Sequence, residues 1–196
     1  QKNIIKTSDK KILYLSIGGY KRFVDFSNSV GNMALWAGMF KVSLFNHVIY
    51  TIANQRVRED VIIHSQLIRY IHSAVQLPYK LYFYRQNPDE SNSNYKALTL
   101  DIFKQYLAAF DFVLTEAKSK KIDITEEINQ TIVYEIMNEL AKTLDHKGKL
   151  NKDVISATQN KLKELLKLNL KLPAKTKFSA KLYIISPNLY KIYRKL

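Results

Sequence analysis

The stretch "DITEEINQTIVYEIMNELAKTLDHKG" (residues 123–148) decides the fold class. Within it, apolar residues recur at every fourth position: Ile124, Ile128, Ile132, Ile136, Leu140 and Leu144. That spacing places the side chains on one face of an α-helix. Asp123 and Glu126 form a capping pattern at the start, and Gly148, preceded by a histidine and a lysine, is typical of a helix end. We therefore expect a well-capped amphipathic helix here.

The overall composition favours the same class. The chain has 196 residues, of which 46% are hydrophobic and 24% are charged, as in globular proteins. Only 5 glycines and 4 prolines are present, which favours helices joined by few turns. The chain contains no cysteine, which excludes disulfides, thiol catalysis and cysteine-ligated metals.

Three further helices are predicted before residue 120. Residues 98–119 carry a helical stripe formed by Phe103, Leu107, Phe110, Leu114 and Ala117. Residues 32–55 are apolar on most sides, which predicts a buried core helix, because Lys41, Asn46 and His47 interrupt the stretch too often for a membrane span. Residues 55–77 continue as a helix that ends at Leu77-Pro78.

The last fifty residues mix lysine with apolar residues. Asn151 caps a helix that we expect to reach about residue 168. From Leu166 to Leu172 leucine alternates with polar residues, which indicates a strand, so a hairpin over 166–185 and a basic helix to Lys171 both stay open. Ser186-Pro187 predicts the start of a short last helix.

These elements predict a mostly α protein, a single compact bundle of about five main helices. A small β element built from residues 11–17 and 166–185 is compatible with the pattern. We expect one domain over 1–196, in which 1–19 form an extended arm or short strand, 20–146 the helical core and 147–196 a basic C-terminal segment.

The basic C-terminal segment, residues 147–196, is the main functional feature of the sequence. It holds 13 Lys and Arg against 2 Asp and Glu, a net charge of +11 out of +14 for the whole chain. Such a block attracts polyanions. The candidate anion-binding residues are Lys161, Lys163, Lys167, Lys171, Lys175, Lys177, Lys181, Lys191, Arg194 and Lys195, and the candidate partner-packing residues are Tyr183, Tyr190 and Tyr193. The bland alternative is that the apolar residues pack on the core while the lysines simply face water.

No strong catalytic or metal-binding motif is present, and we expect neither enzyme activity nor a cofactor or metal site. The four histidines lack metal-site spacing, and carboxylates such as Glu135 and Glu139 suit the solvated face of a helix. One weak pattern is Arg58 and His64 in "REDVIIH", which resembles the motif of HEPN-type ribonucleases. That resemblance implies RNA cleavage by an arginine and a histidine in a dimer cleft.

The sequence therefore predicts a non-catalytic binding or structural subunit of a larger assembly. Its basic segment would contact an acidic protein partner or an anionic surface, and peripheral membrane contact fits the same pattern. Nucleic-acid binding is the alternative, and a HEPN-like ribonuclease the third hypothesis. The chain begins with Gln1 and not with Met, so we expect a mature chain after removal of a signal peptide, outside the cytoplasm.

Overall fold

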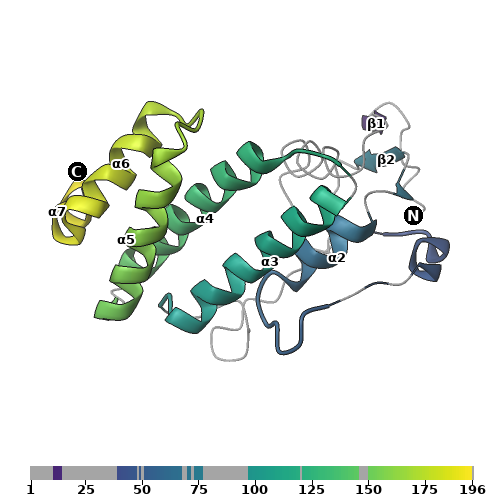
Figure 1. Cartoon of the computed structure of the whole chain (residues 1–196), viewed down its shortest axis with the longest axis horizontal. Helices are drawn as coiled ribbons and strands as arrows, with labels where there is room; N and C mark the ends of the chain where they lie inside the picture. Colours follow the sequence, from purple (N-terminus) through teal and green to yellow (C-terminus); the bar gives the residue numbers. More distant parts are fainter. Residues whose placement is uncertain are drawn as a thin grey trace, which may run out of the picture.

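The computed structural model describes residues 11–14, 39–47, 49, 51–67, 70–71, 73–76, 97–119, 121–145 and 150–195. Over these residues the protein is mostly helical, as predicted (Figure 1). The described elements are strand β1 (Lys11–Tyr14), 3-10 helix η3 (Val42–Asn46), helix α2 (Glu59–Leu67), strand β2 (Ser73–Gln76) and helices α3 (Leu100–Ser119), α4 (Thr125–Asp145), α5 (Lys152–Lys167), α6 (Ala174–Ile185) and α7 (Pro187–Tyr193).

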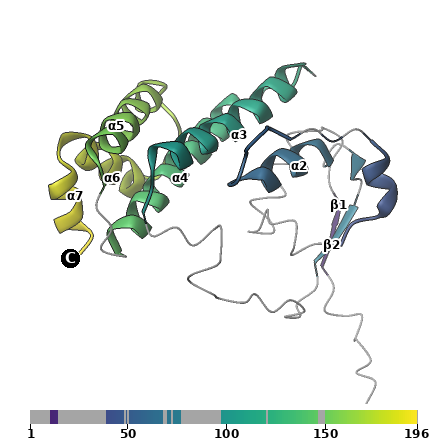
Figure 2. The ribbon, with the colours of Figure 1, turned by 90° about the horizontal axis from the view of Figure 1, so that it is seen from below.

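The long helices α3 and α4 occupy the middle of the molecule. Figures 1 and 2 both place α5, α6 and α7 at one end and the β1–β2 pair with η3 at the other. Helix α2 lies against α3, whereas α5 and α6 both pack on α4. The C-terminal helices therefore form an end cap of the bundle and present an outer surface that faces away from the rest of the protein.

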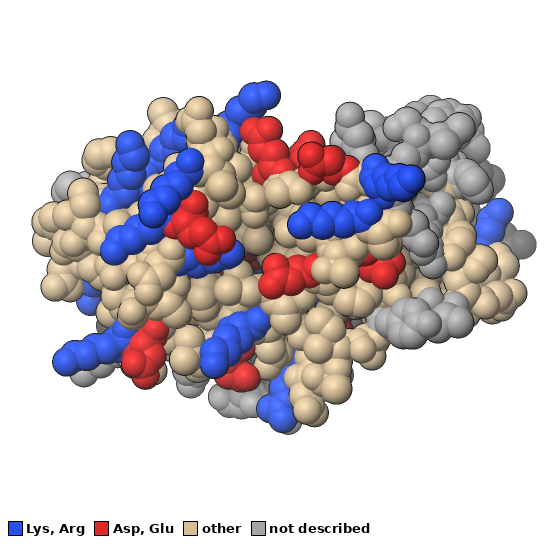
Figure 3. Space-filling view, viewed as in Figure 1, with Lys and Arg blue, Asp and Glu red and all other residues tan. Residues whose placement is uncertain are grey.

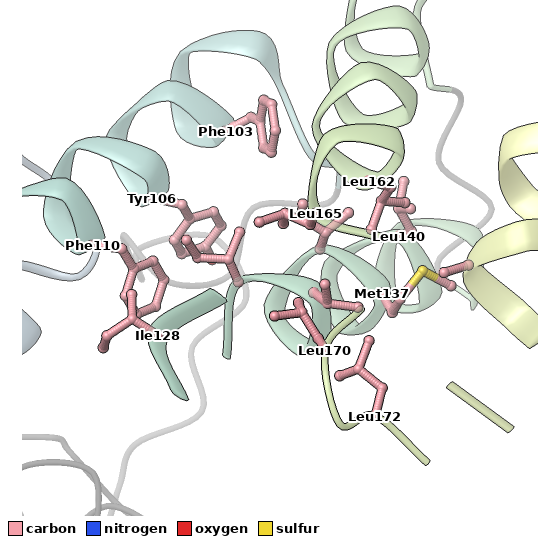
Figure 4. Close-up of a cluster of buried hydrophobic side chains, with 14 of the residues drawn as sticks. Phe103, Tyr106, Phe110, Ile128, Met137, Leu140, Leu162, Leu165, Leu170 and Leu172 are labelled. Carbon is pink, nitrogen blue, oxygen red and sulfur yellow. The ribbon is translucent and has the colours of Figure 1, made fainter. Parts of the chain in front are cut away.

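One hydrophobic cluster runs through the whole bundle. Its buried members come from α2 (Val61), α3 (Phe103, Tyr106, Ala117), α4 (Ile128, Ile132, Leu140), α5 (Leu162, Leu165), α6 (Ala180, Tyr183) and α7 (Tyr190). Figure 4 shows side chains from α3, α4 and α5 converging, with Leu170 and Leu172 of the following loop close to them. The basic C-terminal segment thus contributes to the common core.

The helices predicted over 98–119, from Asp123, from Asn151 and from Ser186-Pro187 are confirmed. Helix α4 begins next to Asp123, whose carboxylate accepts a hydrogen bond from the Thr125 backbone N–H (3.0 Å). The predicted end of this helix at 146–148 lies outside the described residues. Asn151 caps α5, because its side chain accepts a hydrogen bond from the Val154 backbone N–H (2.8 Å).

Two predictions in the first half of the chain are wrong. Val42–Asn46 form a short 3-10 helix, with Met39, Val42 and Phe45 exposed, so the described part of 32–55 does not form the expected buried core helix. Residues 32–38, 48 and 50 of that prediction lie outside the described residues. Ile49, Thr51 and Ile52, which are described and not helical, are β-branched, and β-branched residues favour helices only weakly.

The helix predicted over 55–77 is also too long. Helix α2 ends at Leu67, and β2 pairs antiparallel with β1, with Lys11 opposite Gln76 and Tyr14 opposite Ser73. The N-terminal stretch does form a strand as expected, over 11–14, but its partner is 73–76. Pairing with a distant segment overrides the local helical pattern.

The hairpin proposed over 166–185 does not form. Helix α5 ends near Leu168, Asn169 adopts a left-handed conformation (φ 53°), and α6 covers the predicted second strand. Asparagine tolerates this conformation and ends helices in this way. The alternation arises because Leu170 and Leu172 turn into the core from the loop while Leu168 stays exposed.

Candidate anion-binding surface

Helices α5, α6 and α7 are held together by polar contacts at the end of α6. Gln159 of α5 donates hydrogen bonds through Nε2 to the carbonyl oxygens of Tyr183 (3.1 Å) and Ile184 (3.2 Å). The last carbonyls of a helix have no partner within the helix, so Gln159 stabilises this end of α6. Ser186 then caps α7, its hydroxyl accepting a hydrogen bond from the Leu189 backbone N–H (3.3 Å).

Two of the three tyrosines predicted to pack against a partner face inward, and for them the prediction is wrong. Tyr183 is fully buried, with its hydroxyl 2.9 Å from that of Thr158, and its ring meets that of Tyr190 edge to face at 5.6 Å. Burial raises the pKa of both tyrosine hydroxyls. Tyr193 is half-buried against the same core and meets Phe178 edge to face at 5.5 Å.

The ten cationic candidates lie on α5–α7, in the loop between α5 and α6 or, for Arg194 and Lys195, directly after α7, and most face solvent. Lys161 and Lys177 are half-buried, while the other eight are exposed. Lys161 pairs with Glu164 (2.8 Å), and Arg194 pairs with Asp145 of α4 (2.6 Å), a hydrogen bond that raises the pKa of Arg194. Figure 3 shows lysine and arginine side chains gathered over this end of the molecule.

The remaining eight lysines make no ion pair with any residue that the structure describes. The reason is partly the sequence itself, because residues 165–196 contain no Asp or Glu. Like charges that stay close together without partners repel one another and raise the local positive potential. This end of the molecule therefore favours contact with an anion.

An exposed apolar face accompanies these lysines, and the sequence analysis did not single it out. Phe178, Ile185, Leu189 and Ile192 all face solvent on α6 and α7. Helix α6 is apolar on both sides: Ala180 and Tyr183 are buried, while Phe178 and Ile185 point outward. The signal in the sequence is the spacing of Ala174, Phe178, Lys181 and Ile185, which share one helical face opposite the buried pair. We call Phe178, Ile185, Leu189 and Ile192, together with the exposed Lys175, Lys181, Lys191 and Lys195, the α6–α7 face.

A second charged cluster lies where α2, α3 and α4 meet. The Arg58 guanidinium pairs with the Glu135 carboxylate and stands over the Tyr106 ring, 5.1 Å from its centroid. Burial acts to lower the pKa of Arg58, but the Glu135 carboxylate offsets this effect and the pKa is raised. Nearby, Glu139 is buried and accepts a hydrogen bond from Lys142 (2.8 Å).

The expectation that Glu135 and Glu139 form a solvated face is therefore wrong. Glu139 falls seven residues after Ile132 and four before Thr143, on the same side of α4 as the buried residues. His64 is only 4% exposed and meets Phe40 edge to face, and burial lowers its pKa to about 4. The structure thus places Arg58 in an ion pair and His64 in the interior, an arrangement unlike an open catalytic cleft.

A small polar pocket lies between Arg56 and the start of α3. Its volume of about 230 Å³ is below the usual size of ligand pockets. Over the described residues, no group of three or more metal-ligating side chains comes together, and no helix has the length and apolarity to cross a membrane.

Comparisons with protein-family models, with curated proteins and with solved structures gave no match to this chain.

Proposed function

We propose that the chain is a non-catalytic binding subunit whose lysine-rich C-terminal helices contact an acidic protein partner or another anionic surface. The observation that carries this proposal is the set of eight lysines on or directly beside α5–α7 that have no ion pair among the described residues. Exposed apolar side chains lie on α6 and α7, two of the helices that carry these lysines, and both helices are anchored in the core. A surface that is both apolar and of one charge sign is typical of a docking surface.

The same features support nucleic-acid binding less well. Proteins that hold single strands stack successive bases on several exposed aromatic rings, whereas Tyr183 and Tyr190 are buried here and Phe178 alone is exposed among the aromatic residues described on α6 and α7. Bidentate reading of phosphate and guanine relies on arginine, and Arg194 is already engaged by Asp145. Nothing in the geometry of Arg58 and His64 favours the ribonuclease hypothesis.

The test is a binding series with the full chain at low and moderate salt. The probes are phospholipid vesicles with phosphatidylglycerol, polyglutamate, and single- and double-stranded oligonucleotides. The variant Lys175→Glu/Lys181→Glu is compared with the control Lys104→Glu/Lys118→Glu, which reverses two exposed lysines of α3. Each lysine near an anionic surface is worth about 1 kcal/mol, so the first variant loses about 25-fold or more in affinity and the control about threefold or less.

Three results separate the hypotheses. Salt-sensitive binding to vesicles or polyglutamate that the α6 variant loses supports the proposal. Binding confined to oligonucleotides makes the chain a nucleic-acid-binding protein instead. Equal losses in the two variants, or no binding to any probe at low salt, contradict the assigned role of the C-terminal lysines.

A further inference from the structure

We propose that the anionic surface is a phospholipid bilayer, and that the α6–α7 face enters its interfacial region while the surrounding lysines contact the headgroups. This inference rests on the proposed function and names the partner. It assigns the protein a peripheral contact with the membrane, made by one end of the molecule.

Large apolar side chains are exposed on α6 and α7. Phe178 is 54% exposed, Ile185 76%, Leu189 48% and Ile192 58%. Phe178 and Ile185, seven residues apart, share one face of α6, and Leu189 and Ile192, three residues apart, share one face of α7. Ser186 between the two helices is extended, and α7 packs on α6, with the ring of Tyr193 5.5 Å from that of Phe178. Single exposed apolar residues are ordinary, but a contiguous set is a mark of a membrane or protein contact.

The charge on these two helices is of one sign. Lys175, Lys181, Lys191 and Lys195 are exposed on the same two helices or directly after them, and no acidic residue follows Glu164. Long lysine side chains can keep their ammonium groups at headgroup level while neighbouring apolar groups lie deeper. An anionic leaflet attracts such a surface along its whole width, without requiring matched partners for individual lysines.

The residue composition of the α6–α7 face favours a lipid partner over a protein partner. Protein interfaces are enriched in arginine, tyrosine and tryptophan and depleted in lysine. The α6–α7 face differs in its charged and tyrosine residues: its charges are lysines, Arg194 is bound to Asp145, and Tyr183 and Tyr190 face the core. Phenylalanine, isoleucine and leucine beside lysine are instead the composition of interfacial helices.

The geometry of the end cap supports a preformed contact. Gln159 fixes the end of α6, the ring of Tyr190 packs on that of Tyr183, and Arg194 ties the end of α7 to α4. Helices that are already folded lose little conformational entropy on binding. Figures 1 and 2 show both helices at one extremity of the molecule, where a flat surface can reach them.

The test uses flotation of the full chain with phosphatidylcholine vesicles, with and without phosphatidylglycerol, and polyglutamate as a non-lipid polyanion. The variant Ile185→Ser removes an exposed apolar side chain from the face, and Tyr134→Ser removes one from α4 as the control. We expect binding only to the anionic vesicles, weakened about tenfold by Ile185→Ser through lost apolar insertion and unchanged by Tyr134→Ser. Polyglutamate binding should be the same for Ile185→Ser and the natural chain.

The failures are distinguishable. If polyglutamate binds through Lys175 and Lys181 while anionic vesicles do not, the partner is an acidic protein: the bilayer inference is overturned and the proposed function stands. If vesicles bind but Ile185→Ser binds as tightly as the natural chain, the contact is electrostatic adsorption and insertion is overturned. If neither probe binds, both proposals fail together.

Discussion

Positively charged side chains have opposite surroundings in two regions of the molecule. At the junction of α2, α3 and α4, the Arg58 guanidinium is half-buried, paired with Glu135 and placed over the Tyr106 ring. On the α6–α7 face, Lys175, Lys181 and their neighbours are exposed and lie in a stretch without acidic residues. In the first region the positive charge is paired within the fold. In the second region it is exposed and available to a binding partner.

Burial and ion pairing distinguish charges that stabilise the fold from charges that are available to a partner. A half-buried ion pair loses much of its stabilisation when one member is removed, since the other remains desolvated. An exposed lysine contributes little to stability, so the gathering of many lysines at one end of the molecule needs another explanation. Substitutions in the first region should therefore change unfolding, and those in the second region should change binding.

The largest expected effect concerns the anchoring of the α6–α7 face. Tyr183→Ala removes a fully buried ring and its contact with Thr158, and should lower the free energy of unfolding by about 4 kcal/mol. Ile185→Ala, two residues away but exposed, should change it by less than about 0.5 kcal/mol. Urea denaturation of both variants measures the difference. Similar small losses would mean that α6 is not part of the core.

The next effect concerns His64, which lies buried in α2. Burial lowers its pKa from 6.5 to about 4, so the unfolded chain binds more protons than the folded one between these values. The contribution to stability is complete above pH 6.5 and is lost as the pH falls through about 4, a total of about 3 kcal/mol. His64→Gln should flatten this part of the pH profile of unfolding. An unchanged slope would show that His64 is accessible to protons in the folded state.

A smaller effect should follow from breaking the ion pair of the α2–α4 junction. Glu135→Gln leaves the Arg58 guanidinium without its anionic partner, and its Nε has no hydrogen-bond partner within the described structure. The side chains are 26% and 20% exposed, so water moderates the loss to about 2 kcal/mol. Glu164→Gln, which breaks the surface pair with Lys161, is the control and should cost about 0.5 kcal/mol or less. Equal thermal unfolding midpoints for Glu135→Gln and Glu164→Gln would contradict the expected difference between the half-buried ion pair and the surface ion pair.

The smallest effect on stability should come from the α6–α7 face itself. Lys181→Glu should leave the free energy of unfolding within about 0.5 kcal/mol, because the side chain is exposed and makes no ion pair with a described residue. The same substitution should lower affinity for anionic vesicles at least fivefold, on the order of the contribution of one lysine. Circular dichroism with denaturant and vesicle flotation measure the two quantities. A large loss of stability would place Lys181 in the fold instead.

Local signals were enough to predict most of the second half of the fold. The four-residue recurrence along α4, the cap at Asn151 and the Ser186-Pro187 start of α7 all depend on residues close in sequence. Helix α6 was missed, because Leu182-Tyr183-Ile184-Ile185 resembles a strand and follows leucines that alternate up to Leu172. That alternation has a non-local cause, since Leu170 and Leu172 enter a core formed by other helices.

The structure of the first half of the chain and of the candidate site depends on contacts between residues that are far apart in the sequence. The sequence alone does not reveal these contacts. The strand at Ser73–Gln76 needs its partner at Lys11–Tyr14, and the ion pair of Arg58 needs a carboxylate 77 residues away. The lysines of the site were predicted as a group, since charge is read directly from composition. Tyr183 points inward and Ile185 points outward because one face of α6 meets α4 and α5. Only the tertiary structure specifies which face that is.

The most direct test of the account is an environment-sensitive fluorophore attached to a single cysteine, since the natural chain has none. Ile185→Cys places the label on the α6–α7 face, and Tyr134→Cys places it at an exposed position of α4. With anionic vesicles, the account predicts a blue shift and protection from an aqueous quencher at residue 185 and no change at residue 134. An unchanged spectrum at residue 185 while the protein is vesicle-bound, or equal shifts at both positions, would contradict it.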